Sequence, residues 1–331
     1  MNLTVQTVLA IIAIAAFVFA AYKWQQGKKV PDLGMNSFTQ DITELARNKK
    51  LGKVVGMEEV IDRIIHVIAR KQKNNPLLIG EPGIGKTAAV EGLAQRIVQG
   101  DVPKQFKDKK ILALKLGVLM AGTKYRGELE DRLRTLLESF QERSREVILF
   151  IDEIHMIEQA RGGEGSLDLA DILKPALSRG DLQVIGATTW KEYEQYIKPD
   201  QTVERRFQPI LMQEPSKADT RQILDGVKKE YEAYHGVCIP DETITAAVEA
   251  ADKFIKGRNM PDKAFDVIDE ACAKVSIETS SKPHGAALGL VHAASAKAKL
   301  ECGDKTPIVT PQDVESIAKE WKLKQPKTSS S

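Results

Sequence analysis

The feature that most constrains this chain is the stretch Gly80–Thr87, which reads Gly-Glu-Pro-Gly-Ile-Gly-Lys-Thr. Two glycines separated by four residues and followed by Lys-Thr fit the pattern of a loop that binds phosphate groups. The apolar run Leu77–Ile79 comes directly before the loop, and residues 88–98 after it have a helical pattern. Strand, glycine-rich loop and helix in this order are the context that such a loop needs. The sequence therefore predicts a nucleotide-binding fold built around this loop.

The loop combines three residue types that bind phosphate. Glycines let backbone N–H groups turn towards phosphate oxygens, and the N-terminus of the following helix adds a positive dipole. Lys86 is expected to reach the β- and γ-phosphates, and Thr87 to offer its hydroxyl to Mg²⁺. ATP and Mg²⁺ are therefore the predicted cofactors. The loop residues predicted to bind the nucleotide are Gly80, Glu81, Pro82, Gly83, Ile84, Gly85, Lys86 and Thr87.

A second motif is a strand that ends in two acids. Val147–Ile151 is a run of five apolar residues, which is typical of a strand buried on both faces of a parallel sheet. Asp152 and Glu153 follow at the carboxyl end of this strand, where open parallel sheets hold their ligands. We expect Asp152 to support the metal and Glu153 to polarise the attacking water.

Two further segments place polar groups near the same end of the sheet. Residues 183–189 read as a short strand that ends in hydroxyls and could bring Thr189 close to the γ-phosphate. Arg205 and Arg206 come later in the chain. Either they form salt bridges on their own subunit, or they reach a neighbour's γ-phosphate and stabilise the charge of phosphoryl transfer. The residues alone leave both alternatives open.

The alternation of strands and helices predicts an α/β fold with a parallel sheet covered by helices on both faces. Residues 111–116 read as a further strand, and residues 58–71 and 128–143 as amphipathic helices. Beyond Pro215 the pattern becomes helical, which predicts a second, smaller lid domain. The predicted lid helices cover residues 218–234, 243–254, 262–276, 286–300 and 311–321.

The N-terminus contains the most apolar stretch of the chain. Residues 3–22 are interrupted only by two threonines and a glutamine, and as a helix they would span roughly 30 Å, the core of one bilayer. Tyr22 and Trp24 stand where interfacial aromatic residues are found, and the lysines that follow place the C-terminal side in the cytoplasm. A cleaved signal peptide is the alternative, but it would need a basic start, which is missing here. We expect a retained, single-pass anchor in the cytoplasmic (inner) membrane.

Composition argues against one class of partner. The chain has 48 Lys and Arg against 46 Asp and Glu and only 5% aromatic residues, so no basic face dominates and no nucleic acid is expected. The three cysteines, Cys238, Cys272 and Cys302, are widely separated and lack metal-ligand spacing. They are expected to be ordinary thiols of a reducing compartment.

With these motifs in place, the chain resembles the Clp-type unfoldases of the AAA+ superfamily, in particular the first of their two ATPase modules. The resemblance runs from about Val54 to Trp321. Besides the phosphate loop and the Lys-Asn-Asn-Pro before it, it rests on Lys-Tyr-Arg-Gly-Glu at 124–128, Leu-Lys-Pro-Ala-Leu at 173–177, Gly-Ala-Thr-Thr at 186–189, Glu-Arg-Arg-Phe at 204–207 and Pro-Asp-Lys-Ala at 261–264.

The resemblance implies a role for each matching residue of the ATP site. Lys86 and Thr87 would bind nucleotide and Mg²⁺, and Asp152 would support the metal. Glu153 would be the catalytic base, and Thr189 would sense the γ-phosphate. The residues implied for the adenine pocket are Val54, Val55 and Ile223, with the region around Pro261.

The resemblance also implies contacts beyond one subunit. Arg205 and Arg206 match the arginine fingers donated to the neighbouring subunit of a ring, and Tyr125 matches the pore-loop aromatic that grips a polypeptide. A plain surface tyrosine is the alternative for Tyr125. A lid sensor arginine is not evident, although Lys263 and Arg258 stand near the matching place.

The chain departs from those unfoldases in its domains. Double-ring Clp proteins carry an adaptor-binding N-terminal domain, often a coiled-coil middle insertion, and a second ATPase module that docks on a peptidase. Here the apparent anchor takes the place of the first, and the other two are missing, so a peptidase partner is doubtful. The predicted domains are the anchor (1–24), a juxtamembrane linker (25–50), the AAA+ domain (51–213), the lid (214–322) and a polar tail (323–331).

These observations predict a membrane-tethered homo-hexamer that hydrolyses ATP and unfolds, translocates or remodels proteins. Because of the tether, membrane-associated proteins are the expected substrates. One alternative is an ATP-dependent scaffold of a secretion or conjugation complex that threads nothing. A nucleic-acid motor is a further alternative, which the missing basic surface disfavours.

Overall fold

The computed structural model describes residues 38–120, 126–142, 146–159, 182–281, 302 and 306–324. The described residues from 40 onwards belong to one compact unit. The predicted membrane segment at 1–24 and the predicted helix at 286–300 lie outside the described residues. Among the helices that are described, none has the length and apolar character needed to cross a bilayer.

A six-stranded sheet forms the centre of the nucleotide-binding domain. Its strands run in the order β1-β3-β4-β5-β2-β6, and the pairings β3–β4, β4–β5, β5–β2 and β2–β6 are parallel. The strands are β1 (Thr39–Asp41), β2 (Asn75–Ile79), β3 (Lys110–Leu114), β4 (Val147–Ile151), β5 (Gln183–Thr188) and β6 (Phe207–Leu211). The predicted α/β fold with a parallel sheet is confirmed, and parallel pairing brings the carboxyl ends of these strands to one edge.

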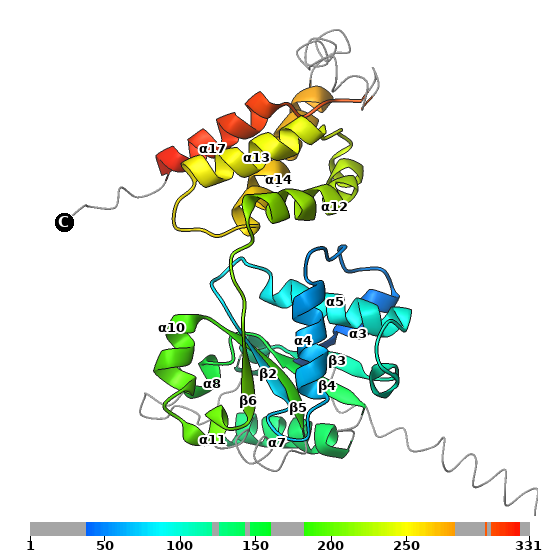
Figure 1. The fold of residues 1–331 in the computed structure, drawn as a ribbon, viewed down its shortest axis with the longest axis vertical. Coiled ribbons are helices and arrows are strands. Elements are labelled where there is room, and N and C mark those ends of the chain that lie inside the picture. Colours follow the sequence, from blue (N-terminus) through cyan, green and yellow to red (C-terminus); the bar gives the residue numbers. More distant parts are fainter. Residues whose placement is uncertain are drawn as a thin grey trace, which may run out of the picture. The chain divides into compact units, whose positions relative to one another are not determined.

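Three helices cover one face of this sheet (Figure 1). They are α3 (Ile42–Arg47), α4 (Glu58–Ile68) and α5 (Lys86–Gln99). Their apolar side chains share one buried core with alternate residues of the strands, such as Leu78, Ile148 and Ile185. Every residue of β2 and β4 is buried, which explains why Leu77–Ile79 of β2 and the whole of β4 read as continuous apolar runs rather than as alternating ones.

The remaining elements of the domain connect the strands. They are η1 (Lys104–Phe106), α6 (Leu116–Met120), α7 (Arg126–Glu142), α8 (Met156–Gln159), α10 (Trp190–Glu192), the π-helical turn η2 (Tyr193–Ile197) and α11 (Gln201–Glu204). The stripe of α7 that reads as apolar in the sequence is buried at Leu133, Leu136, Leu137 and Phe140. This confirms the predicted amphipathic helix.

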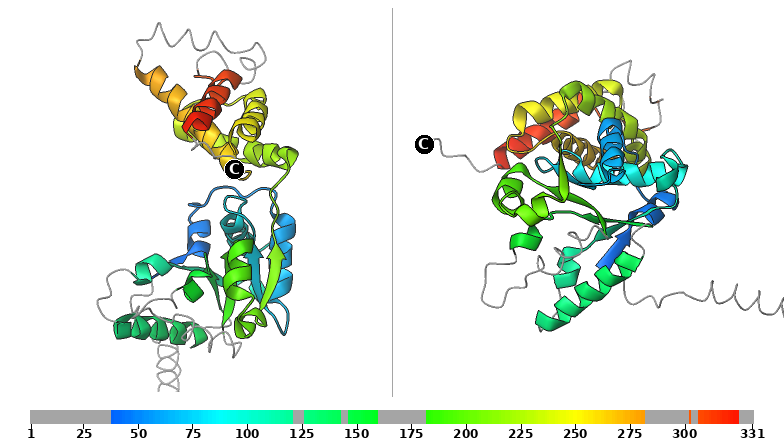
Figure 2. Two further views of the ribbon diagram at one scale, coloured as in Figure 1. Left: turned by 90° about the vertical axis from the view of Figure 1, so that its left-hand side faces the viewer. Right: turned by 60° about the horizontal axis from the view of Figure 1, so that its bottom comes forward.

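The lid is a bundle of four described helices that pack side by side (Figure 2). They are α12 (Lys217–His235), α13 (Asp241–Phe254), α14 (Asp262–Ser281) and α17 (Pro311–Lys324). They share their own core, in which residues such as Ala247, Val267 and Ala318 are fully buried. Four of the five predicted lid helices are therefore confirmed, each within a few residues of its predicted bounds.

The structured part of the chain begins earlier than the predicted boundary at residue 51. β1 covers residues 39–41, and the helix α3 follows it directly at residues 42–47. Thr43 Oγ1 accepts a hydrogen bond of 2.7 Å from the Ile111 backbone N–H of β3, which ties α3 to the sheet. Residues 40–47 of the predicted linker thus belong to the folded domain.

The cysteines correct another expectation. Cys238 and Cys302 were predicted to be free thiols, but they form a disulfide that joins residues 64 apart in sequence. The physical reason is a short parallel bridge in which Cys238 N donates to Pro307 O (2.8 Å) and Val309 N donates to Cys238 O (2.9 Å). This bridge brings the segment that follows Cys302 next to Cys238. The spacing of the cysteines in the sequence does not reveal this proximity.

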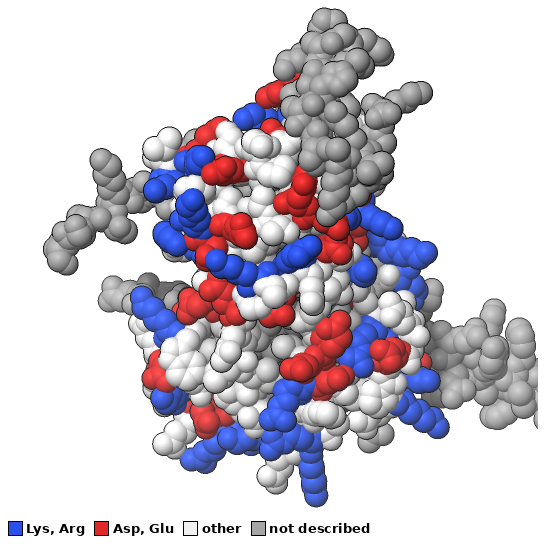
Figure 3. Space-filling view, turned by 45° about the horizontal axis from the view of Figure 1, so that its top comes forward, with Lys and Arg blue, Asp and Glu red and all other residues white. Residues whose placement is uncertain are grey.

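Charged side chains of both signs are interspersed on the face of the molecule shown in Figure 3. Charged side chains also form surface ion pairs, as in Lys217 with Asp252 (2.5 Å) and Lys319 with Glu315 (2.9 Å). Mixed charge on this face agrees with the nearly equal numbers of basic and acidic residues.

Candidate nucleotide-binding and catalytic site

The phosphate loop connects the carboxyl end of β2 to the first turn of α5. Gly83 (φ +80°) and Gly85 (φ +98°) have left-handed backbone conformations that other residues rarely adopt. Space is short as well, since a Cβ on Gly85 would lie 2.5 Å from Met57 Cε and one on Gly83 would lie 2.7 Å from Asp262 Cβ. The glycines are therefore required by the shape of the loop.

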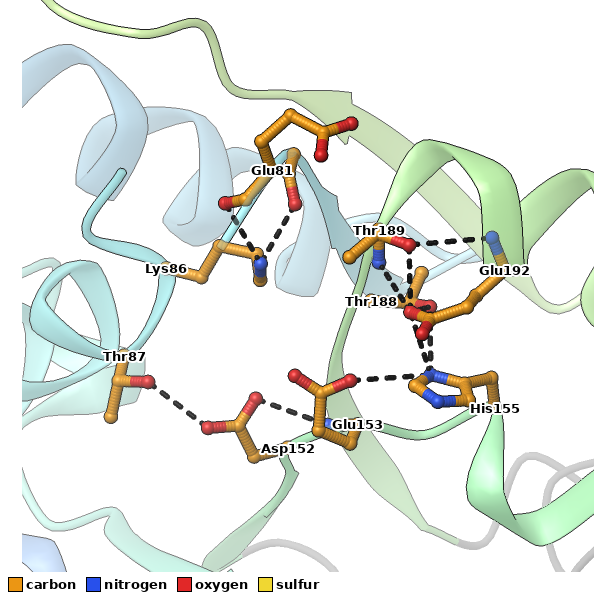
Figure 4. Close-up of polar contacts among 10 residues, drawn as sticks. Glu81, Lys86, Thr87, Asp152, Glu153, His155, Thr188, Thr189 and Glu192 are labelled. Atoms are coloured by element: carbon orange, nitrogen blue, oxygen red, sulfur yellow. Dashed lines mark hydrogen bonds and ion pairs between the residues drawn. The ribbon is translucent and has the colours of Figure 1, made fainter. Parts of the chain in front are cut away.

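Lys86 extends from the start of α5 into the loop and is only 7% exposed. Its Nζ donates hydrogen bonds to the carbonyl oxygens of Gly80 (2.7 Å) and Glu81 (3.1 Å), as Figure 4 shows. A buried ammonium at the mouth of a loop of backbone N–H groups gives a site for phosphate oxygens.

Asp152 connects the loop with the end of β4. Thr87 Oγ1 donates to Asp152 Oδ2 (3.0 Å), and Asp152 Oδ1 accepts from the Glu153 backbone N–H (3.0 Å). A hydroxyl and a carboxylate are the hard oxygen ligands that Mg²⁺ prefers, so these two side chains fit the metal predicted for them. Mg²⁺ held there would neutralise the negative charge that develops on the phosphates.

Glu153 follows Asp152 with a positive φ of 50°, which is unusual for a residue that is not glycine. Burial raises the pKa of its carboxyl above the ordinary value, an effect opposed by the nearby His155 and Lys86. A carboxylate with raised basicity at the carboxyl end of a parallel strand suits the role of a general base.

A polar cluster beside Glu153 was missed by sequence reasoning. His155 is 5% exposed, and its Nδ1 lies 3.1 Å from Thr188 Oγ1, 3.1 Å from Glu192 Oε2 and 3.4 Å from Glu153 Oε2 (Figure 4). Thr188 is the last residue of β5. The cluster therefore joins the ends of β4 and β5 to the first turn of α10.

Thr189 caps α10. Its Oγ1 accepts from Glu192 N (3.3 Å), and the Glu192 carboxylate accepts from Thr189 N (3.1 Å) and Thr189 Oγ1 (2.7 Å), which together form a capping box. The hydroxyl predicted to sense the γ-phosphate is thus engaged in a helix cap in this structure. The spacing Thr189-x-x-Glu192 is the sequence signal that could have revealed the cap.

A pocket of about 410 Å³ joins the loop to the lid. Its lining includes Gly83, Lys86, Thr87, Asp152 and Glu153. It also includes Val54, Val55 and Ile223, the residues that the resemblance implies for adenine. Its volume falls within the range typical of small-molecule sites. Pro261, Asp262 and Phe265 of the lid complete the lining.

Hydrogen bonds fix the lid beside the loop. Asn259 Nδ2 donates to Pro82 O (3.0 Å), and Lys53 N donates to Glu230 Oε1 (3.0 Å).

Glu91 also lines the pocket. Burial raises the pKa of its carboxyl above the ordinary value.

The two residues considered for a lid sensor are engaged elsewhere. Arg258 donates to Asp262 (2.9 Å) and to Asp266, and Lys263 is 6% exposed and lies 3.7 Å from the Glu214 carboxylate. Neither lines the pocket.

Arg205 and Arg206 are exposed at the end of α11, just before β6. Arg205 Nη2 donates to Gln201 Oε1 (2.9 Å), and within the described ranges neither arginine has an ion pair with an acid. Neither lines the pocket of its own chain. Tyr125, the predicted pore-loop residue, lies outside the described residues.

The loop, its buried lysine and the acids at the end of β4 define the site of a P-loop nucleoside triphosphatase. Residues 76–214 match the ATPase family associated with various cellular activities (AAA), and residues 216–320 match the AAA lid domain. The chain belongs to the AAA+ ATPases of the Clp/Hsp104 type.

Curated relatives support this assignment. The chain is 49% identical over 249 residues to chaperone protein ClpB of Pseudomonas putida. The aligned region covers 75% of this chain and 29% of ClpB. It is 49% identical over 250 residues to the ATP-dependent Clp protease ATP-binding subunit ClpC of Staphylococcus aureus, covering 76% of this chain and 30% of ClpC. The chain therefore spans less than a third of the length of these two relatives.

Solved structures are similar as well. A closed-state cryo-EM reconstruction of Hsp104 with ATPγS and FITC casein has a TM-score of 0.74 at 40% identity, covering 89% of this chain and 46% of that one. The Saccharomyces cerevisiae Hsp104–ADP complex has a TM-score of 0.73 at 41% identity, covering 88% of this chain and 46% of that one.

Proposed function

We propose that this protein is a membrane-tethered AAA+ ATPase that assembles into a hexameric ring and couples ATP hydrolysis to the unfolding, translocation or remodelling of proteins. The observation that carries the ATP-dependent part is the pocket where Lys86, Thr87, Asp152 and Glu153 meet. In it, Lys86 and the loop N–H groups bind phosphates, and Glu153 accepts a proton from the attacking water. Thr87 and Asp152 would hold Mg²⁺, which would neutralise charge on the phosphates.

Action on a protein substrate is supported by the similarity to Hsp104 structures that contain casein. The ATP site and the lid lie in residues 76–214 and 216–320, which match the AAA family and its lid domain. In this proposal Tyr125 contacts the polypeptide, as the resemblance to pore loops implies.

Assembly into a ring is supported by Arg205 and Arg206. Both are exposed and lie away from the pocket lining of their own chain, as expected for groups that complete the site of a neighbour. An arginine that approaches the γ-phosphate stabilises the charge of the transition state.

The tether is supported by the apolar sequence at 3–22 and the lysines that follow it. We place the ATPase on the cytoplasmic face of the inner membrane, where ATP is available. Recovery of the intact N-terminus in the membrane fraction after carbonate extraction supports the tether, and a soluble or shortened chain contradicts it.

The decisive experiment is ATP-driven unfolding of a loosely folded fluorescent protein by the full-length protein in detergent. Wild type is compared with Tyr125→Ala at matched ATPase rates, and with Glu153→Gln. We expect unfolding by wild type, little unfolding by Tyr125→Ala, and neither hydrolysis nor unfolding by Glu153→Gln. Rapid phosphate release by Glu153→Gln contradicts its assignment as the base.

The alternative is a scaffold ATPase whose ring changes shape with nucleotide without threading a substrate. It requires the same ATP pocket but not Tyr125. The threading proposal is rejected if Tyr125→Ala unfolds the substrate as fast as wild type does. The scaffold alternative is favoured if wild type hydrolyses ATP but does not unfold casein-like substrates.

A further inference from the structure

We propose that His155 is a positioning residue for Glu153: its Nδ1–H holds one oxygen of the Glu153 carboxylate, and Glu192 competes for the same N–H. The inference deepens the proposed function and rests on Glu153 being the base for ATP hydrolysis.

The backbone around His155 is fixed by hydrogen bonds. Ile154 N donates to Ala187 O (2.9 Å) of β5, and Met156 N donates to Glu153 O (2.9 Å). The imidazole is buried at 5% exposure, and its ring stacks at 6.1 Å from that of Tyr196. An imidazole ring that is held in place by these contacts can fix the orientation of the neighbouring Glu153 carboxylate.

The surroundings of Nδ1 determine the tautomer. Two carboxylate oxygens, Glu192 Oε2 at 3.1 Å and Glu153 Oε2 at 3.4 Å, converge on this nitrogen. A lone pair on Nδ1 would face both negative charges, so Nδ1 carries a hydrogen. Thr188 Oγ1 lies 3.1 Å from the same nitrogen. One N–H makes one strong hydrogen bond at a time, so the two carboxylates compete for it with each other and with this hydroxyl.

The two carboxylates differ in what else they bind. Glu192 Oε2 also accepts from Thr189 Oγ1 (2.7 Å), Thr189 N (3.1 Å) and Thr188 Oγ1 (3.4 Å). Burial raises the pKa of Glu192, but these hydrogen bonds and His155 outweigh burial and leave the pKa below its ordinary value. The Glu192 carboxylate can therefore lose its hydrogen bond from the His155 N–H and still accept hydrogen bonds from Thr188 and Thr189.

Glu153 depends on His155 more strongly. In the part of the chain that the structure describes, His155 is the one side chain within ion-pair or hydrogen-bond distance of the Glu153 carboxylate. Figure 4 shows one carboxylate oxygen directed at His155 and the other directed away from it. Holding the first oxygen fixes the second, which is then oriented to accept a proton from water.

The cluster gives the site a point of control. Glu192 lies in α10, whose cap begins at the end of β5. A shift of α10 that moves Glu192 away from His155 would give the N–H fully to Glu153, and the opposite shift would withdraw it.

Three substitutions at one position test the hydrogen bond. In His155→Asn the side-chain amide can place an N–H at the same number of bonds from Cα as Nδ1, whereas in His155→Gln the amide lies one bond further out. His155→Ala removes the donor. We expect kcat to fall about tenfold or more in the Ala and Gln variants and to stay within about twofold in the Asn variant, with KM for ATP unchanged in all three.

Competition by Glu192 is tested with Glu192→Gln. Glutamine can keep the capping box but is a weaker acceptor than a carboxylate. We expect its kcat to equal or exceed that of wild type, and we expect no effect of Glu192→Gln in the His155→Ala background. A fall in kcat of similar size in both backgrounds overturns the competition.

Thermal unfolding of each variant separates positioning from folding. If His155→Ala does not fold, the Asn and Gln pair decides: equal kcat values in these two variants overturn the inference. Wild-type kcat in the Ala variant overturns it too.

Glu153→Gln measured in parallel distinguishes two kinds of failure. If it hydrolyses ATP at the wild-type rate, the base assignment itself is wrong and the inference falls with it. If it is inactive while the His155 variants are normal, the proposed function stands and the role of His155 alone is rejected.

Discussion

Cys272 shows how strongly burial controls the chemistry of a single residue. It lies in α14 with no exposed surface, in the core that the lid helices share. Burial in these apolar surroundings, with smaller effects of Asp269 and Glu232, raises the pKa of its thiol to about 12. Because the thiolate is the reactive form, Cys272 should be inert in the folded lid.

We predict that Cys272 resists alkylation by iodoacetamide at pH 8 in the native protein and reacts once the protein is unfolded. The raised pKa keeps the thiol protonated at this pH, and unfolding returns it to its ordinary value. Peptide mass spectrometry gives the extent of labelling at each cysteine. Cys238 and Cys302, which are half-buried, serve as controls after reduction and should be labelled first. Fast native labelling of Cys272 would contradict the packing of the lid.

Residues of the ATP site differ in how far the sequence reveals them. Lys86 and Thr87 belong to a continuous motif, so their chemistry could be predicted from spacing alone. The contact between His155 and Glu192 could not be predicted in this way, because it joins residues that follow two different strands. The role of Glu192 becomes visible only when β4 and β5 lie side by side.

At the scale of elements, α12 begins with a capping box. Ser216 Oγ accepts from Asp219 N (3.2 Å) and donates to the Asp219 carboxylate (2.6 Å), which in turn accepts from Ser216 N (3.3 Å). These bonds satisfy backbone donors that have no partner inside the helix.

We predict that Ser216→Ala lowers the free energy of unfolding by about 1 kcal/mol through loss of the cap. The measurement is urea unfolding followed by circular dichroism. Ser316→Ala in α17 is the matched control, since the one hydrogen bond found for this hydroxyl among the described residues is 3.5 Å long, and alanine favours the helix interior. Equal effects of the two substitutions would mean that the cap contributes nothing.

Elements were predicted well where their pattern is long. The lid helices have extended 3.6-residue periods, and their predicted bounds are close to those observed. β1 was missed because three residues carry too little pattern. β6 was missed because Pro209 interrupts its apolar residues, and proline argues against a strand except at an edge of a sheet. β6 is such an edge strand, a position that only the assembled sheet reveals.

At the scale of the whole molecule, the proposed ring makes a prediction about Arg205 and Arg206. Arg205→Ala and Arg206→Ala should each bind ATP normally but lose most hydrolysis, because each site would lack a neighbour's guanidinium at the γ-phosphate. Phosphate release and nucleotide binding are measured on the same samples. Arg63→Ala, an exposed arginine in α4, is the control and should be unaffected.

Mixing two inactive variants gives a sharper outcome. Arg206→Ala subunits keep Glu153, and Glu153→Gln subunits keep Arg206, so a mixed ring contains sites that combine both intact groups. We expect activity to return on mixing. Normal turnover by both arginine variants alone, or no recovery in mixtures that are shown to assemble, would contradict a shared site.

Pro209 also affects how copies of this protein can meet. An edge strand normally exposes a row of unpaired N–H and C=O groups. Another polypeptide can pair with this row, which is a common way for aggregation to begin. Proline interrupts the row in β6, since it has no N–H to offer. Even at high local concentration, two copies are therefore not expected to pair through the edge strand β6. Association of subunits would then depend on contacts between side chains.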